Sequence, residues 1–443
     1  MYSSCSFVQQ LLDCWFWLLL KETQREKCLL NTFLYFCHII INPKYIQVIK
    51  ILNIPSSKSI SNRLLILQAL YPNLKIERLS TAEDTKVLQK ALANASESID
   101  IGHAGTTMRF LTAYYAVQEN KSVILDGSRR MRQRPVKILV DVLQQLGADI
   151  SYLENEGFPP LHIKGKKISG NTLKIPSNIS SQYISALLLV APKLPKGLSL
   201  ELIGASVSKP YIKMTISLLK QLGIQVFQNQ NQIKVYPKKQ IENQILKVES
   251  DWSSASYFYS FLAVNRKEKL SLEGFSETSL QGDSLVKKYF EKLGIKTSFK
   301  DNGSMILSAD KDFDMPKQLT FDLIDQPDLA QTLATTCLAL GIECEIFGLQ
   351  TLRIKETDRL LALKTEMEKL GASVQISKNA LYLRALKALK KHVKIETYDD
   401  HRMAMSFAVL RSLVPIEIKD EEVVKKSFPN FWEIYPLKGT KIR

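Results

Sequence analysis

The sequence predicts an α/β protein divided into two lobes, each assembled from copies of one supersecondary unit. Four amphipathic stretches end in Leu-Gly and run into a β-like segment, and their glycines are separated by 76, 71 and 77 residues. A repeat of about seventy residues is too long for a solenoid and suits an α/β unit. Two polar crossings, at residues 53–58 and 248–253, divide the chain into lobes.

The repeated segment is a helix that ends at a glycine and is followed by a strand. It reads LQQLGADI, LLKQLGIQV, YFEKLGIKT and EMEKLGASV, with Gly147, Gly223, Gly294 and Gly371 at the junctions. A glycine after the last apolar helical position is a common left-handed C-cap, and the residues beyond it are typical of a strand. We therefore expect four helices to end at a left-handed glycine.

The composition is that of a globular protein. Its 443 residues are 45% hydrophobic and 23% charged, which excludes a disordered, collagen-like or coiled-coil chain. Lys and Arg outnumber Asp and Glu by 60 to 44, and this charge of +16 favours nucleic acid, an anionic membrane surface or multiply anionic small substrates. The six Cys form no CxxC pair and His is scarce, so we expect no metal site and a reducing cytoplasm.

The crossings give the predicted domains. Residues 1–43 are interpreted as an N-terminal appendage, because their three basic and three acidic residues leave the whole charge of +16 to the rest of the chain. Their apolar runs are shorter than the roughly 18 residues that a membrane helix needs, so we expect no membrane association. Lobe I is predicted over 56–249, and lobe II over 44–55 together with 250–443.

Several motifs of lobe I place cations, hydroxyl groups or glycine where a polar turn enters an apolar helix. A helix start offers free N–H groups and a positive dipole to an anion, although each motif taken alone also fits a capped or solvated turn, which is the more common case for PSSKSISNR. The residues concerned are Lys58, Ser59 and Arg63 in PSSKSISNR, Gly105 in HAGTTMR, Ser180, Ser181 and Gln182 in SSQYISALLL, and Ser208 and Tyr211 in SKPYI.

The segment RRMRQRP packs Arg129, Arg130, Arg132 and Arg134 into six positions. Such a cluster implies an anionic partner or acidic neighbours, and by itself it fits a nucleic-acid patch as well as a phosphate site. Against nucleic acid, the chain carries no aromatic-rich RNA-recognition motif and no basic zipper helix. The glycine spacings that bind ATP or NAD are also missing.

In lobe II, acidic and basic residues mix at the helix starts. Asp325 and Asp328 precede an apolar helix, where an acid is usually a cap, and RIKETDR by itself is a salt-bridged helix face. If the repeated units point their helix starts at one place, dipoles and cations converge on a polyanion. The candidate residues are Asp328, Lys355, Glu356 and Arg359, with Arg402 in DDHRMAM and Lys426 in KKSFPNF.

These motifs, with DWSSASYF and QPDLA, occur in an order that resembles the 5-enolpyruvylshikimate-3-phosphate synthase (3-phosphoshikimate 1-carboxyvinyltransferase) family over residues 44–435. The resemblance implies a two-lobed inside-out α/β barrel of the enolpyruvyl transferase type, with three β-α-β-α-β-β units in each lobe. It also implies transfer of the enolpyruvyl group of phosphoenolpyruvate to the 5-hydroxyl of shikimate 3-phosphate, with release of phosphate, in the shikimate pathway to the aromatic amino acids. No cofactor is implied.

The resemblance also implies roles for the candidate residues. Asp328 would be the base for the 5-hydroxyl, and Glu356, assisted by Lys58, would handle the proton at the methylene carbon. We expect no nucleic-acid or membrane partner and a cytoplasmic monomer. Shikimate 3-phosphate would be held by Lys58, Ser59, Arg63, Ser180, Ser181, Gln182, Ser208, Tyr211, Asp328 and Lys355. Phosphoenolpyruvate would be held by Lys58, Gly105, Arg130, Gln182, Arg359, Arg402 and Lys426.

Three positions depart from the family pattern. His103 stands where Asn or Ser is frequent, Thr351 where a phosphate-contacting Asn is common, and Ser56 where Gly is usual. No ligand role is therefore carried onto His103 or Thr351.

Two alternative functions fit part of the sequence. The sister carboxyvinyltransferase that acts on UDP-N-acetylglucosamine usually has a Cys in a mobile loop, and the Arg-rich stretch has none. A basic nucleic-acid-binding protein would account for the charge but would leave Asp328 and Glu356 without a task.

Overall fold

The computed structural model describes residues 50–93, 96–176, 180–204, 208–301 and 303–436. The predicted appendage, and residues 44–49 of the predicted lobe II, lie outside these ranges. From Ile51 onward the described residues belong to one compact unit. Within that part of the chain, no helix has both the length and the apolar character needed to span a membrane.

Four sheets of the described chain repeat one topology. In the first, β3 and β4 pair in parallel and an antiparallel hairpin completes the order β3-β4-β6-β5. Its elements are β3 (Ser98–Asp100), α5 (Gly105–Ala116), β4 (Ser122–Asp126), α6 (Lys137–Gln145), β5 (Asp149–Tyr152) and β6 (Leu161–Lys164).

The other three sheets have the orders β7-β8-β10-β9, β1-β12-β14-β13 and β15-β16-β18-β17. The second unit is β7 (Thr172–Pro176), α7 (Ser181–Val190), β8 (Leu198–Ile203), α8 (Lys209–Gln221), β9 (Val226–Gln228) and β10 (Gln232–Val235). The third is β1 (Lys50–Asn53), α9 (Trp252–Val264), β12 (Lys269–Glu273), α10 (Val286–Glu291), β13 (Ile295–Phe299) and β14 (Ser304–Ala309). The fourth is β15 (Gln318–Asp322), α11 (Ala330–Leu340), β16 (Glu343–Phe347), α12 (Arg359–Lys369), β17 (Val374–Ile376) and β18 (Leu381–Leu383).

Two further sheets, β11-β2 and β19-β20, are pairs of parallel strands. The described residues thus form two sets of three sheets, and each set has two four-stranded sheets and one two-stranded sheet. In the first pair α4 is followed by β3, without the hairpin that ends each four-stranded unit. Their elements are α3 (Lys58–Leu70), β2 (Leu74–Glu77), α4 (Glu83–Ala93), β11 (Gln244–Lys247), β19 (Val393–Ile395), α13 (His401–Phe407), β20 (Ile416–Ile418) and α14 (Phe431–Ile434).

The glycine repeat has the predicted conformation. Gly147, Gly223, Gly294 and Gly371 have φ angles of 105°, 68°, 72° and 97°, and each lies between a helix and the strand that begins the hairpin. A residue with a Cβ is strained at positive φ, whereas glycine is not. The prediction of four helices that end at a glycine is therefore confirmed.

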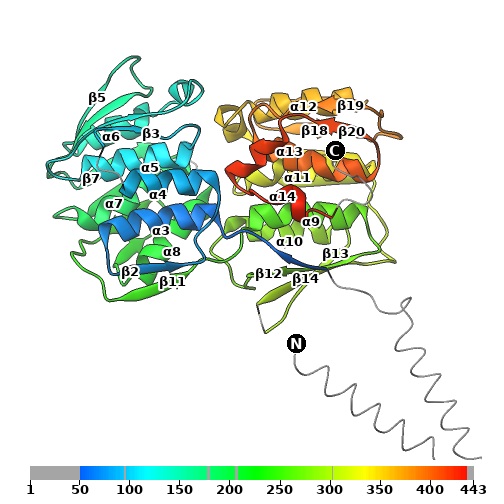
Figure 1. The fold of residues 1–443 in the computed structure, drawn as a ribbon, viewed down its shortest axis with the longest axis horizontal. Helices are drawn as coiled ribbons and strands as arrows, with labels where there is room; N and C mark the ends of the chain where they lie inside the picture. Colours follow the sequence, from blue (N-terminus) through cyan, green and yellow to red (C-terminus); the bar gives the residue numbers. More distant parts are fainter. Residues whose placement is uncertain (1–49, 94–95, 177–179, 205–207, 302, 437–443) are drawn as a thin grey trace, which may run out of the picture. The chain divides into compact units, whose positions relative to one another are not determined.

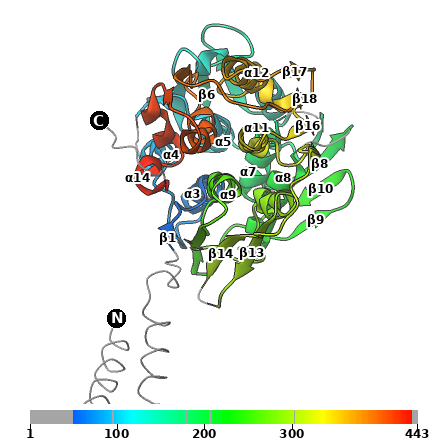
Figure 2. The same cartoon turned by 90° about the vertical axis from the view of Figure 1, so that its right-hand side faces the viewer.

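The helices lie inside and the sheets outside. Helices α3, α5 and α7 contact one another, and α9 and α13 both contact α11 (Figure 1). After a quarter turn, strands lie above, to the right of and below these helices (Figure 2), as in the inside-out barrel that the family resemblance implies. Apolar side chains form two separate cores, one drawn from residues 60–248 and one from residues 52–54 and 252–435. We call the elements from α3 to β11 the first half, and β1 with α9 to α14 the second half. The lobe boundaries stay a prediction.

The two predicted crossings run side by side. Ser56 and Ser250 form an antiparallel bridge, the N–H of Ser57 donates to the Glu249 carbonyl at 2.9 Å, and the N–H of Asp251 donates to the Pro55 carbonyl at 2.9 Å. Helices α3 and α9 begin directly beyond this bridge. The crossing therefore fixes the starts of both helices, and the start of α3 lines the main pocket.

Candidate active site

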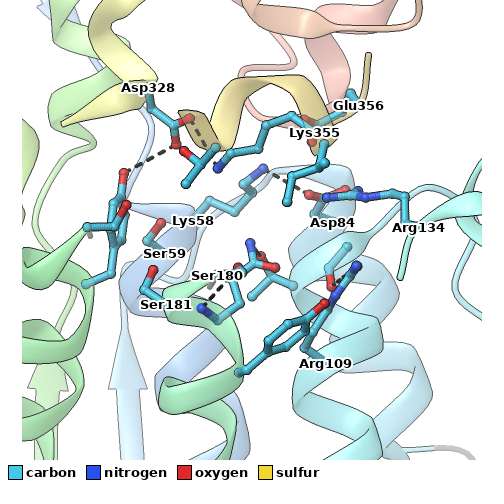
Figure 3. Close-up of a pocket in the computed structure, with 18 of the residues that line it drawn as sticks. Lys58, Ser59, Asp84, Arg109, Arg134, Ser180, Ser181, Asp328, Lys355 and Glu356 are labelled. Carbon is cyan, nitrogen blue, oxygen red and sulfur yellow. Dashed lines mark hydrogen bonds and ion pairs between the residues drawn. The ribbon is translucent and has the colours of Figure 1, made fainter. Parts of the chain in front are cut away.

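Helix starts from both halves meet at one pocket. The starts of α3, α5 and α7 line it from the first half, and those of α12 and α13 line it from the second, together with the short helix η4 (Pro327–Leu329) before α11. Figure 3 shows Asp328 and Lys355 on one side and Ser180 and Ser181 on the other, with Lys58 between them. The predicted site residues that line it are Lys58, Ser59, Arg63, Gly105, Ser180, Ser181, Gln182, Ser208, Tyr211, Asp328, Lys355, Glu356, Arg359 and Arg402.

The start of α3 carries Lys58 into the pocket. The Ser57 hydroxyl caps the helix by accepting the N–H of Ile60 at 3.4 Å. The capping residue Ser57 and the cation Lys58 are therefore consecutive residues. The Nζ of Lys58 lies 2.9 Å from Oδ2 of Asp84, in the first turn of α4. Lys58 is therefore held by a carboxylate from a neighbouring helix.

One turn further along α3, Arg63 is buried beneath the pocket. Its Nε donates to Oγ1 of Thr215 at 2.8 Å and one Nη to Oγ of Ser185 at 3.1 Å. Burial lowers the pKa of Arg63 to about 10, so the guanidinium is still a cation at neutral pH. Arg63 therefore places a positive charge at the first-half wall of the pocket.

The start of α7 offers hydroxyl and amide groups. The Ser180 hydroxyl accepts the N–H of Gln182 at 3.3 Å, and Nε2 of Gln182 donates to Oγ1 of Thr106, in α5, at 3.2 Å. Ser181 follows Ser180 as the first residue of the helix. Two hydroxyls at a helix start, tied to the neighbouring helix start by Gln182, form a site that suits a phosphate ester.

Gly105 allows an arginine to lie directly over the start of α5. A Cβ at this position would lie 2.4 Å from one Nη of Arg134, so any side chain would displace that guanidinium. Arg109, one turn along α5, donates to the carbonyls of Gly105 at 3.0 Å and of Pro135 at 3.1 Å. Burial, and next the charge of Arg134, lowers the pKa of Arg109 to about 10.

In the second half, Asp328 is held by three cations. Its carboxylate lies 2.8 Å from Arg359, 3.1 Å from Arg402 and 3.6 Å from the Nζ of Lys355. The Tyr211 hydroxyl of the first half donates to its Oδ2 at 3.3 Å. Burial by itself would raise the pKa of Asp328, but the charges of Arg402, Lys355 and Arg359 outweigh burial and lower it.

Arg359 binds two more carboxylates. Its guanidinium lies 2.9 Å from Glu356 and 2.6 Å from Asp400, and its side chain is only 2% exposed. The other oxygen of Glu356 lies 3.1 Å from the Nζ of Lys426. Burial would raise the pKa of Glu356, but the charges of Lys426 and Arg359 outweigh it and hold the pKa well below its usual range.

Two predicted site residues, Arg130 and Lys426, line a smaller adjoining pocket. Arg130 donates to the backbone carbonyl of Glu356 at 3.0 Å and to that of Lys355 at 3.3 Å. Glu356 lines both pockets, so both cations reach the candidate site through it. His103 also lines the small pocket.

Two of the three departures from the family pattern, His103 and Thr351, line the pockets. One ring nitrogen of His103 is 3.0 Å from the Ser128 hydroxyl. Thr351 lines the main pocket, and its buried hydroxyl has no hydrogen-bond partner among the described residues. Neither position gains a ligand role from these contacts.

Four residues that shape the site were not among the predicted site residues: Asp84, Arg134, Asp400 and His401. The Arg-rich motif was a signal for Arg134, whereas an acid in the first turn of a helix, as at Asp84, gives no sign of a partner. Burial, and next the charge of Lys58, lowers the pKa of His401 well below its usual range, so its imidazole is neutral. The described residues contain no cluster of three metal-ligating side chains.

The pocket therefore combines many cations and free helix starts with a few ionised carboxylates. Such a site binds small molecules that carry several negative charges, and its carboxylates can accept and return protons. The fold and the site together define an inside-out α/β protein whose pocket suits small molecules that carry several negative charges.

Comparison with known proteins identifies the family. The sequence model of EPSP synthase (3-phosphoshikimate 1-carboxyvinyltransferase) matches residues 47–435. The 3-phosphoshikimate 1-carboxyvinyltransferase of Bacteroides fragilis (strain YCH46) is 42% identical over 390 residues, which cover 87% of this chain and 94% of the relative. That of Haemophilus influenzae (strain Rd) is 37% identical over 420 residues, covering 86% and 94%. The chain belongs to the EPSP synthase family.

A solved structure supports the fold independently of close sequence similarity. EPSP synthase from Acinetobacter baumannii superposes with a TM-score of 0.68 at 21% identity, over 87% of this chain and 94% of that one. The family resemblance and the fold class predicted from the sequence are thus confirmed. The family match also decides against the two alternatives, a UDP-N-acetylglucosamine transferase and a nucleic-acid-binding protein.

Proposed function

We propose that this chain transfers the enolpyruvyl group of phosphoenolpyruvate to the 5-hydroxyl of shikimate 3-phosphate and releases phosphate, as a 3-phosphoshikimate 1-carboxyvinyltransferase of the shikimate pathway. The observation that carries the proposal is the meeting of cation-bearing helix starts from both halves around Asp328 and Glu356. Family membership over residues 47–435 supports it.

The charge of the pocket suits this substrate pair. Two phosphates and a carboxylate repel one another, and charge-assisted hydrogen bonds of about 1.5–3 kcal/mol each oppose that repulsion. Shikimate 3-phosphate is assigned to the first-half residues around Ser180, Ser181 and Lys58. Phosphoenolpyruvate is assigned to Lys58, Gly105, Arg130, Gln182, Arg359, Arg402 and Lys426, while Lys355 and Asp328 are assigned to shikimate 3-phosphate.

Asp328 is proposed as the base for the 5-hydroxyl. Without substrate its ion pairs with Arg359, Arg402 and Lys355 hold its pKa low, and such a carboxylate is a weak base. Bound phosphate and carboxylate groups compete for the same cations. When they draw a cation away, the pKa of Asp328 rises toward its usual range, and the carboxylate can accept the proton of the hydroxyl. Substrate binding itself thus prepares the base.

Glu356, assisted by Lys58, is proposed to handle the proton at the methylene carbon. In the addition step the 5-oxygen forms a bond to the central carbon of phosphoenolpyruvate, and a proton is delivered to the methylene carbon. In the elimination step a proton leaves that carbon and the bond to phosphate breaks, which restores the double bond. To deliver this proton Glu356 must first carry it, so substrate anions that draw Lys426 or Arg359 away must raise its pKa from the low value of the empty site. Glu356 then gives its proton to the methylene carbon in the addition step and takes one back in the elimination step, so it ends in the state in which it began.

We also propose that the enzyme is a monomer of the cytoplasm. Cys337 and Cys344 are buried and form no disulfide, as expected for a protein of a reducing compartment.

The test is phosphate release from phosphoenolpyruvate in the presence of shikimate 3-phosphate. We expect release only with both substrates, and we expect Lys58→Ala and Asp328→Ala each to slow it by about 10²–10⁴-fold while the circular dichroism spectrum is unchanged. Lys75→Ala and Asp322→Ala, at exposed positions of the same two halves, are the matched controls. Normal turnover in either site variant would remove that residue from the mechanism.

A further inference from the structure

A second carboxylate is buried next to the proposed base. Asp283 lies in the short helix η3 (Gly282–Leu285) and is 4% exposed. Its Oδ2 accepts a hydrogen bond from the Ser253 hydroxyl, and its Oδ1 has no hydrogen-bond partner within the described ranges. Burying an ionisable group without a directly bonded cation lowers the free energy of unfolding, so a neutral residue at this position would give a more stable fold.

Asp283 is connected to the proposed site by a short chain of contacts. The Ser253 hydroxyl, in the first turn of α9, also accepts a hydrogen bond from one Nη of Arg402 at 3.3 Å. That same Nη lies 3.1 Å from Oδ2 of Asp328. Ser253 therefore joins Asp283 to the guanidinium that pairs with the proposed base.

The place of Asp283 is fixed from the first half as well. A Cβ on Gly282 would lie 2.3 Å from the Cβ of Pro210, so η3 packs directly against the start of α8. The next residue of α8 is Tyr211, whose hydroxyl donates to Asp328. The carboxylate of Asp283 thus lies where the two halves press together behind the pocket.

We propose that Asp283 is a positioning residue, which acts through Ser253 to hold the Arg402 guanidinium toward Asp328 and toward bound phosphoenolpyruvate. The inference rests on the proposed function, because it is there that Arg402 is assigned to phosphoenolpyruvate. Asp283 itself does not line the pocket.

The charges around Asp283 are consistent with this task. Burial, and next the negative charge of Asp328, raises the pKa of Asp283 to about 6, while the charge of Arg402 opposes the rise. At pH 7.5 the carboxylate is therefore ionised and attracts Arg402 in addition to orienting the serine hydroxyl.

The experiment compares the variants Asp283→Ala, Ser253→Ala and their double variant by steady-state phosphate release at pH 7.5. We expect each single variant to raise the KM for phosphoenolpyruvate about tenfold, the loss of one charge-assisted contact, and to leave the KM for shikimate 3-phosphate unchanged. Because both residues act along one chain of contacts, the double variant should be no worse than the worse single one. Asp322→Ala, at an exposed position, is the matched control.

Asp283→Asn separates positioning from plain packing. Asn keeps an oxygen that can accept the Ser253 hydroxyl, so this variant should recover much of the phosphoenolpyruvate affinity that Asp283→Ala loses. A purely structural role would instead lower the unfolding temperature and raise both KM values together. Should Asp283→Ala fail to fold, Ser253→Ala and Asp283→Asn still carry the comparison.

Three results would overturn the inference. If the wild type needs both substrates but the KM for phosphoenolpyruvate is unchanged in Ser253→Ala and in a folded Asp283 variant, the positioning role is wrong and the proposed function stands. The same holds if the effects of the two single variants multiply in the double variant. If the wild type releases no phosphate from the substrate pair, the proposed function is wrong and this inference is wrong with it.

Discussion

Replacing Arg359 by Met should strongly destabilise the second half. Arg359 is 2% exposed and lies 2.6 Å from Asp400, 2.8 Å from Asp328 and 2.9 Å from Glu356. Met has a similar length but no charge, so three carboxylates with little or no exposure lose a common cation. Removing one partner of a buried ion pair costs about 3–5 kcal/mol of unfolding free energy. We expect Arg359→Met to lose at least that amount.

The assay is urea unfolding followed by the fluorescence of Trp252 and Trp432, which lie in the second half. The matched control is Arg132→Met, because Arg132 also pairs with two carboxylates but is 38% exposed. Exposed ion pairs contribute about 0–1 kcal/mol, so the control should unfold almost as the wild type does. An Arg359→Met variant within about 1 kcal/mol of the wild type would refute the reasoning that this charge cluster depends on one buried cation.

Three further outcomes are expected. The pKa values of Asp328 and Glu356 are lowered by folding, so the unfolded chain binds more protons in acid; the stability they contribute is present above about pH 4 and should fall as pH drops below it, as urea midpoints from pH 7 to pH 3 would show. Gly105→Ala should raise the KM for phosphoenolpyruvate, since its Cβ would meet Arg134 at 2.4 Å, and an unchanged KM would contradict this. Deleting residues 1–40 should leave phosphate release unchanged, and an inactive or insoluble truncation would show that the segment is needed.

The sequence predicted those features that local chemistry determines. The positive φ of glycines such as Gly147 and Gly223 follows from the Leu-Gly ending of each helix. The capping of α3 and α7 follows from serines at their starts. The repeated path from polar turn to apolar helix indicated that helix starts converge, and the structure places them at one pocket.

The contacts that sequence reasoning missed are long-range. Lys58 and Asp84 are 26 positions apart, and Arg359 and Asp400 are 41 apart, so no helical or strand periodicity connects either pair. The position of Asp325 before an apolar helix predicts a helix cap, but its Oδ1 accepts the N–H of Lys209 from the other half at 3.0 Å. Which carboxylate meets which cation is decided by how the sheets assemble.

Phosphate release by the wild type with two different acceptors tests most directly whether this pocket gathers the two proposed substrates. Phosphoenolpyruvate should yield phosphate with shikimate 3-phosphate and none with UDP-N-acetylglucosamine. Release with the sugar nucleotide, or no release with either acceptor, would contradict the assignment of the helix starts around Ser180 and Ser181 to shikimate 3-phosphate.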